Sequence, residues 1–299
     1  MKKQLLLVLF LLGGINAFSQ KITLAPISDH YKELQTFSAA PNAQRAWMDT
    51  IKYPSSQYGG SIVYLLVKPY YLSESQVKAL SESVRFPANS SDQVRNELDY
   101  MLDLQNKRTP EQIKRVEFLA NIGYWPPINL LPSHLSYAQN LKDLFFESRE
   151  LMGEDINAKN FPKVSKLLQG VMQDMRIMEF TIKYKLLRPR PYHLEPNLKP
   201  LTTINSPSFA SGHTLWAFVQ AFTWSEVALE KQKDFIALAE EIRRSREIMG
   251  IHYPSDNEAS RQVAFKMLQY YSQNEIFKKD LSEAIAEWKS VSPTFTSKK

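Results

Sequence analysis

The sequence predicts an all-α fold built as a helical bundle. Long segments of the 299-residue chain repeat apolar residues at the spacing of one helix face, and proline-rich stretches separate them. Helix-start signals precede some of these segments. The segment Ser61–Val67 could form a strand or a short buried helix, and periodicity leaves that choice open. With 43% hydrophobic residues the chain can bury a sizeable core, and no repeat of fixed period suggests a solenoid.

The N-terminus has the pattern of a secretory signal over residues 1–19. Lys2 and Lys3 form its charged start, an apolar run follows, and a small-x-small cleavage site ends at Ser19. The run is shorter than the ~20 residues that a membrane span needs, which favours a cleaved signal over a retained anchor. We therefore expect an exported protein, periplasmic or secreted. Residues 20–85 are interpreted as an N-terminal extension, and residues 86–299 as the helical domain.

The first helices of this domain are predicted from their start signals. Ser90 and Gln93 have the spacing of a capping box, and the apolar residues from Val94 to Leu102 continue one face. A stronger signal begins at Thr109, which proline and then Gln112 follow at the favoured positions. A further helix is expected at about 137–152.

The second half of the chain begins with the longest predicted helix, residues 162–187. Its methionines are interpreted as core filler, and Pro189 and Pro191 end it because proline cannot continue the hydrogen-bond ladder. A polar, proline-containing loop follows up to Ala210. The remaining helices are predicted at about 214–229, 234–249, 258–272 and 275–290.

Composition limits the classes of function. The chain has no cysteine, which excludes thiol chemistry and fits an exported protein without disulfides. Removal of Lys2 and Lys3 with the signal lowers the formal net charge from +6 to +4. This mild positive balance suits anionic substrates, and without a basic run it does not indicate nucleic acid as a partner. No segment after the signal is expected to span a membrane.

Three motifs carry the candidate chemistry. The first is Lys183 with Arg190-Pro191, whose two cations are two helical turns apart, so a helix reaching Arg190 would present both on one face. With Lys185 and Arg188 nearby, the alternative is a solvated basic face. The second is Ser211-Gly212-His213, directly before an apolar helix. Free backbone N–H groups at a helix start bind oxyanions, although Ser211 could also be an ordinary cap.

The third motif is Ser245-Arg246 followed by His252 and Asp256. A carboxylate bonded to one imidazole nitrogen fixes the tautomer and leaves the other nitrogen as a nucleophile, although such a pair can also be purely structural. The three motifs together supply three cations, two imidazoles, a hydroxyl, a glycine and a carboxylate. Their joint occurrence favours one site for a tetrahedral oxyanion. Of the remaining histidines, His193 is near enough to the first motif to line that site.

The pattern K-x6-R-P, S-G-H and S-R-x5-H-x3-D resembles the signature of the type 2 phosphatidic-acid phosphatase and vanadium haloperoxidase superfamily. Within it, residues 86–275 look most like the bacterial class A non-specific acid phosphatases, which are exported and helical. Ala210 departs from the proline usual before the serine, and Tyr192 from the usual phenylalanine.

The resemblance implies a role for each residue. Substrate phosphate would be held by Lys183, Arg190, Ser211, Gly212 and Arg246. The catalytic residues would be His252 as nucleophile, His213 as general acid and then base, and Asp256 as the partner that orients His252.

The resemblance also implies a metal-independent phosphomonoesterase that forms a phosphohistidine. Its partner would be a small-molecule phosphomonoester. No cofactor or metal is expected, and phosphate or vanadate can occupy the site. A vanadium-dependent haloperoxidase and a lipid head-group phosphatase stay open as alternatives, as does a homo-oligomer.

Overall fold

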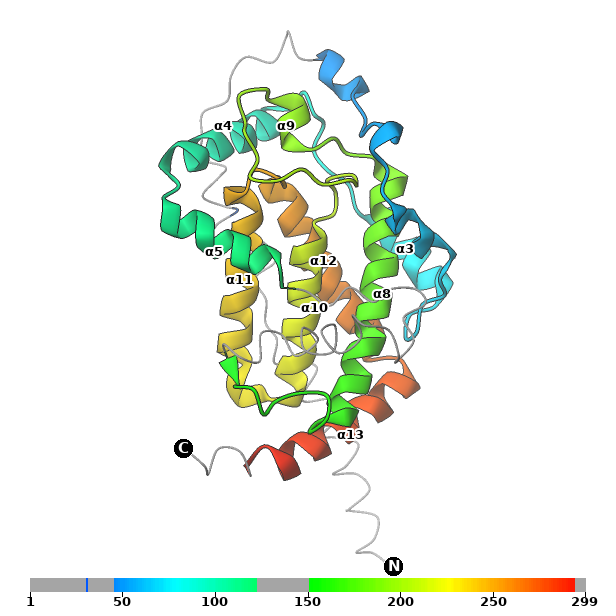
Figure 1. The fold of residues 1–299 in the computed structure, drawn as a ribbon. Helices are drawn as coiled ribbons and strands as arrows, with labels where there is room; N and C mark the ends of the chain where they lie inside the picture. Colours follow the sequence, from blue (N-terminus) through cyan, green and yellow to red (C-terminus); the bar gives the residue numbers. More distant parts are fainter. Residues whose placement is uncertain (1–30, 32–45, 123–150, 294–299) are drawn as a thin grey trace, which may run out of the picture.

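The computed structural model describes Tyr31, residues 46–122 and residues 151–293, and the regular structure in these ranges is entirely helical (Figure 1). The all-α prediction is confirmed. The predicted signal and the greater part of the predicted helix at 137–152 lie outside these ranges. The α-helices are α3 (Glu74–Ser83), α4 (Asp92–Lys107), α5 (Pro110–Ala120), α8 (Pro162–Leu186), α9 (Pro191–Leu194), α10 (Gly212–Val227), α11 (Gln232–Ile248), α12 (Pro254–Tyr271) and α13 (Glu275–Val291). Short 3-10 helices are η1 (Ala46–Thr50), η2 (Ser55–Gln57), η3 (Gly60–Leu66) and η4 (Leu229–Lys231).

Helix α10 forms the centre of the bundle and packs against α8, α11 and α12 (Figure 1). All of its residues except His213 and Glu226 are buried, as expected for a helix that is apolar all round. Within the described ranges, no helix combines the length and the apolar character that crossing a membrane requires.

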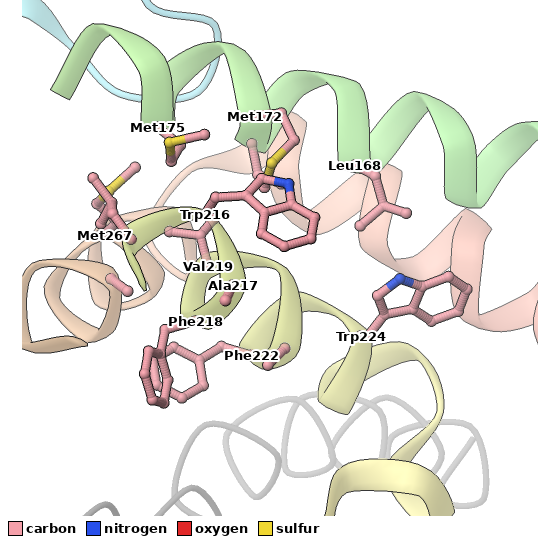
Figure 2. Close-up of a cluster of buried hydrophobic side chains, with 14 of the residues drawn as sticks. Leu168, Met172, Met175, Trp216, Ala217, Phe218, Val219, Phe222, Trp224 and Met267 are labelled. Atoms are coloured by element: carbon pink, nitrogen blue, oxygen red, sulfur yellow. The ribbon is translucent and has the colours of Figure 1, made fainter. Parts of the chain in front are cut away.

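Large side chains from three helices interlock in the main core (Figure 2). Met172 and Met175 of α8 face Trp216 of α10, and Met267 reaches the same cluster from α12. All four side chains are fully buried. Flexible thioethers fill the irregular space around the indole, so the interpretation of the methionines as core filler is confirmed.

Of two predicted helix starts, one is confirmed and the other is displaced by one residue. Thr109 caps α5 with a complete capping box, because its hydroxyl accepts from the Gln112 N–H and the Gln112 side chain accepts from the Thr109 N–H. The predicted box at Ser90 is wrong by one residue. Ser91 caps α4, while the Ser90 hydroxyl binds Asp49 in the N-terminal region. A long-range partner has displaced the local one.

The long helix α8 ends at Leu186, four residues before Arg190, the second cation of the first motif. Leu187 takes a left-handed conformation with φ of 52°, and its N–H closes the helix on the Lys183 carbonyl. Arg190 then stands at the N-cap of α9. Lys183 and Arg190 therefore do not share a helix face, because the chain turns before it reaches Arg190, in agreement with the predicted helix end at about 187.

The N-terminal region is tied to α8 through a buried carboxylate. Asp174 accepts from the backbone N–H groups of Tyr70, Tyr71 and Leu72, with bonds of 2.9 Å to the last two. Tyr71 and Leu72 belong to the main hydrophobic core. The segment Ser61–Val67 is neither a strand nor a buried helix: it lies mostly in η3, where Leu66 is 85% exposed.

Candidate active site

The three motifs come together where several helices begin or end, at the end of the bundle that carries α4 and α9 (Figure 1). The predicted residues stand in the last turn of α8 (Lys183), at the N-cap of α9 (Arg190), at the start of α10 (Ser211, Gly212, His213), in the last turn of α11 (Arg246) and around the start of α12 (His252, Asp256). Loops join these helix ends over short distances, so residues far apart in the sequence become neighbours.

His252 is held by both of its ring nitrogens. Nδ1 lies 3.1 Å from Asp256 Oδ2, and Nε2 lies 2.9 Å from Arg190 Nη1. A guanidinium can only donate, so Nε2 must present its lone pair while Nδ1 carries the proton that Asp256 accepts. Burial and the charge of Arg190 hold the pKa of His252 well below its usual range. The imidazole is therefore neutral, with its outward nitrogen in the form that a nucleophile needs.

Asp256 is fixed by more partners than His252. Its Oδ1 accepts from Arg188 at 2.6 Å, and its Oδ2 also accepts from Ser208 Oγ and from the Tyr253 N–H. Burial acts to raise the pKa of Asp256, but the Arg188 charge and the hydrogen bond from His252 outweigh it and keep the pKa well below its usual range. Asp256 is thus an ionised, immobile acceptor for His252.

Lys183 and Arg190 are almost completely buried, which excludes a solvated basic face. The Lys183 ammonium donates to the carbonyls of Pro207 and Ser208, at 2.5 and 3.3 Å. Arg190 donates to the Ser206 carbonyl at 2.9 Å and to the same Pro207 carbonyl at 3.2 Å. Burial, followed by the nearby Arg190 charge, lowers the pKa of Lys183 to about 7. These cations are under-compensated, so an anion beside them would be strongly stabilised.

Gly212 opens α10 in a crowded place. Ser211 is the N-cap residue, but its hydroxyl donates to Thr214 Oγ1 at 2.9 Å and makes no cap bond, so the ordinary-cap alternative is wrong. A Cβ on residue 212 would lie 2.5 Å from Cδ of the buried Glu179 and closer still to its Oε1. Only glycine lets the helix start approach this carboxylate so closely.

His213 and Arg246 meet α5 over the same region. His213 Nε2 lies 3.1 Å from the Ala120 carbonyl, which can only accept, so Nε2 carries a proton. Arg246 donates to Ser245 Oγ at 2.8 and 3.0 Å and to the Val116 carbonyl at 3.3 Å. Burial and then the Arg246 charge hold the pKa of His213 well below its usual range.

Four further residues belong to this region and carried no recognisable signal in the sequence. Arg188 and Ser208 bind Asp256, Glu97 binds Arg188, and Glu179 lies between Lys183 and Gly212. Arg188 was visible only as one more cation near the first motif. His193, by contrast, accepts the Arg190 N–H at 3.2 Å and lies against Tyr53 and Tyr192.

Comparisons with known proteins bear on the family and the fold. A family model described as the PAP2 superfamily matches residues 165–275. A non-specific acid phosphatase of Providencia stuartii is 30% identical over 145 residues, which are 46% of this chain and 58% of that protein. The crystal structure of a bacterial vanadium-dependent iodoperoxidase superposes with a TM-score of 0.54 at 18% identity, over 81% of this chain and 63% of that one. This last likeness concerns the fold alone. Residues 165–275, which hold all three motifs, are therefore a PAP2 superfamily domain.

Proposed function

We propose that this protein is an exported phosphomonoesterase, similar to acid phosphatases, that works through a phosphohistidine and without a metal ion. The observation that carries the proposal is His252: a neutral imidazole, oriented by an ionised Asp256, whose Nε2 lies within hydrogen-bond distance of a buried cation. A purely structural histidine does not require two buried cations, Arg190 and Lys183, beside it. The relative from Providencia stuartii supports the reaction class, and residues 1–19 support export.

Substrate binding follows from the charges. Lys183, Arg190 and Arg246 would meet the non-bridging oxygens of a phosphate group, and the free N–H groups at the start of α10 would complete the cradle. The Arg190 guanidinium, which lies on His252 Nε2, would turn to a phosphate oxygen and leave the nitrogen lone pair aimed at phosphorus. Fixed donors of this kind stabilise the charge that develops on the oxygens in the transition state.

The first chemical step is attack of His252 Nε2 on phosphorus. The Nε2–P bond forms while the P–O bond to the alcohol breaks, and His213 gives its proton to the departing oxygen. The imidazole becomes a phosphorylated cation, and Asp256 stabilises it through the Nδ1 proton. General acid help of this kind contributes about 10²–10⁴-fold.

The second step returns the enzyme to its starting state. Water attacks phosphorus and gives a proton to His213, the N–P bond breaks, and its electron pair returns to Nε2. The low pKa of His213 makes it a strong acid once protonated, and the negative charge of a bound phosphate opposes this lowering. The same histidine can therefore act first as acid and then as base.

The test uses the purified full chain with an aryl phosphate and His252→Ala. We expect phosphate release by the parent protein and a loss of at least about 10³-fold in the variant, in line with the removal of a nucleophile. Activity of the variant within about tenfold of the parent would remove His252 from the mechanism. Circular dichroism of both proteins controls for folding.

The same preparation separates the alternatives. Iodide oxidation with vanadate and peroxide, in the absence of phosphate release, would indicate a haloperoxidase. A panel of nucleotide, sugar, aryl and lipid phosphates defines the substrate class, and exclusive hydrolysis of the lipid phosphates would favour the head-group phosphatase.

A further inference from the structure

An ion-pair network lies at Oδ1 of Asp256, the carboxylate oxygen that does not bond to His252. At its centre is Arg188, which is fully buried and stacks on the ring of Tyr253, with the guanidinium carbon 3.8 Å from the ring centre. Its Nη1 donates to Asp256 at 2.6 Å and to Ser255 Oγ at 2.8 Å. Arg188 thus binds the carboxylate that orients the proposed nucleophile.

Glu97 of α4 completes this network from outside the PAP2 domain. Its carboxylate is almost fully buried and lies 3.5 Å from Arg188 Nη2. It also accepts from the Ser255 N–H at 3.0 Å and from the Ser255 hydroxyl at 2.8 Å. Residue 97 is far in sequence from residues 165–275, which the family model matches, yet it touches the first turn of α12, where Asp256 stands.

The charges explain why this contact matters. Arg188 is shared between the carboxylates of Asp256 and Glu97. The attraction of Glu97 for Arg188 therefore limits how strongly Arg188 attracts Asp256. Burial raises the pKa of Glu97 to about 7, so Glu97 carries its charge above that pH. Without this charge, Arg188 would bind Asp256 alone and draw it away from His252 Nδ1. A neutral side chain at residue 97 would also be a weaker acceptor for the Ser255 N–H. The first turn of α12, which holds Asp256, would then be less firmly fixed. Both effects act on the orientation of His252, not on the cations of the cradle.

We propose that Glu97 is a positioning residue of the active site: through Arg188 and Ser255 it holds Asp256 in the orientation that aims His252 Nε2 at phosphorus. This inference rests on the proposed function and deepens it. It assigns a catalytic purpose to α4, an element that precedes the PAP2 domain in the chain. Outer partners that orient an active-site imidazole typically contribute about 10–100-fold in affinity or rate.

The test compares two anions that use the site differently. Phosphate is held by the cradle alone, whereas vanadate, as a five-coordinate mimic, also needs a bond to a correctly aimed His252 Nε2. We expect Glu97→Gln to weaken vanadate binding by about tenfold or more and to lower kcat similarly, while the Kd of inorganic phosphate changes less than about threefold. Calorimetry on the folded full chain measures both affinities, independently of the active fraction that biases kcat.

Asp99→Asn is the matched control. It removes one carboxylate from the same helix, two residues away, where Asp99 pairs with the partly exposed Arg95. This variant should bind vanadate and phosphate as the parent does. If Glu97→Gln does not fold, Ser255→Ala provides a second variant, because it removes one contact to Glu97 and one to Arg188; the same selective loss of vanadate binding is expected.

Two results would overturn the inference. One is unchanged vanadate binding in the folded variant, and the other is an equal weakening of vanadate and phosphate, which would indicate a general structural role. Failure of the proposed function gives a different outcome, because the parent protein itself would then neither bind phosphate nor hydrolyse the aryl phosphate.

Discussion

Replacing Gly212 with alanine tests the crowded start of α10. The new Cβ would lie 2.5 Å from Glu179 Cδ, whereas ordinary contacts begin at 3.4 Å, so the carboxylate must retreat by roughly 1 Å. Glu179 is buried and paired with the equally buried Arg176, so this retreat strains an ion pair with little room to move. Gly212 does not adopt a left-handed φ, and the steric conflict is therefore the main cost.

The expected loss is about 1–3 kcal/mol in the free energy of unfolding, the usual cost of overpacking a dense interior. For a protein of this size it corresponds to a lowering of Tm by roughly 2–4 °C per kcal/mol. Alanine keeps the N–H that Gly212 would present to the phosphate, but the steric conflict would displace it, so kcat should fall by less than the about 10²–10³-fold that complete loss of one oxyanion donor costs. Thermal unfolding followed by circular dichroism and phosphate release from an aryl phosphate measure the two effects.

A double-mutant cycle identifies the cause. Glu179→Ala removes the conflicting group, so its combination with Gly212→Ala should recover at least about 0.5–1 kcal/mol relative to the sum of the single losses. Glu179→Gln keeps the bulk of the side chain and should give no such recovery. If the alanine pair is additive to within about 0.5 kcal/mol, the conflict with Glu179 is not the reason that glycine is needed here.

Four further predictions concern pH, metal and stability. Burial and Arg190 lower the pKa of Lys183 to about 7. Because phosphate binding needs the charged ammonium, inhibition by inorganic phosphate should weaken as the pH rises from 6 to 8, about one unit on either side of that pKa. The Lys183→Arg variant keeps its charge over this range and should flatten the pH dependence of inhibition. His252, whose pKa is also lowered, should keep its neutral nucleophile at acidic pH, so kcat should remain high below pH 6; a collapse of kcat there would contradict the assignment. Dialysis against a chelator should leave phosphate release unchanged, and a strong loss restored by divalent metal would refute the metal-free proposal. Asp174→Ala should leave three backbone N–H groups, those of Tyr71 and Leu72 in buried bonds, without their acceptor. We expect the free energy of unfolding to fall by about 2 kcal/mol or more in urea denaturation, and a change below about 1 kcal/mol would argue against the role of this carboxylate.

Local signals in the sequence predicted the helices well where the cause is local. Thr109 caps α5 because the hydroxyl and its partner are three residues apart, and the apolar period of α8 continues almost to the predicted end. The prediction failed at Ser90, where a contact to Asp49, 41 residues earlier, replaces the cap. The end of α8 was predicted to within one residue from the prolines that follow it, although the left-handed conformation of Leu187 has no compositional signal.

The candidate site shows the same division. Its central residues were proposed because their spacing forms motifs, and Lys183 and Arg190 come near each other without sharing a helix face. Glu97 and Arg188 were missed because they lie 91 residues apart, and a single carboxylate and a single cation are common on any helix surface. Their burial and pairing reveal them, and these are properties of the tertiary structure alone.

The enclosure of α10 also bears on how this protein could be re-engineered. The helix whose first turn holds part of the candidate site packs against α8, α11 and α12, so most substitutions along it disturb the interior and not the site. Directed evolution toward new leaving groups should therefore gather its beneficial mutations in the surrounding loop of residues 195–206 and in α5. Residues in these two segments can vary while α10 stays unchanged.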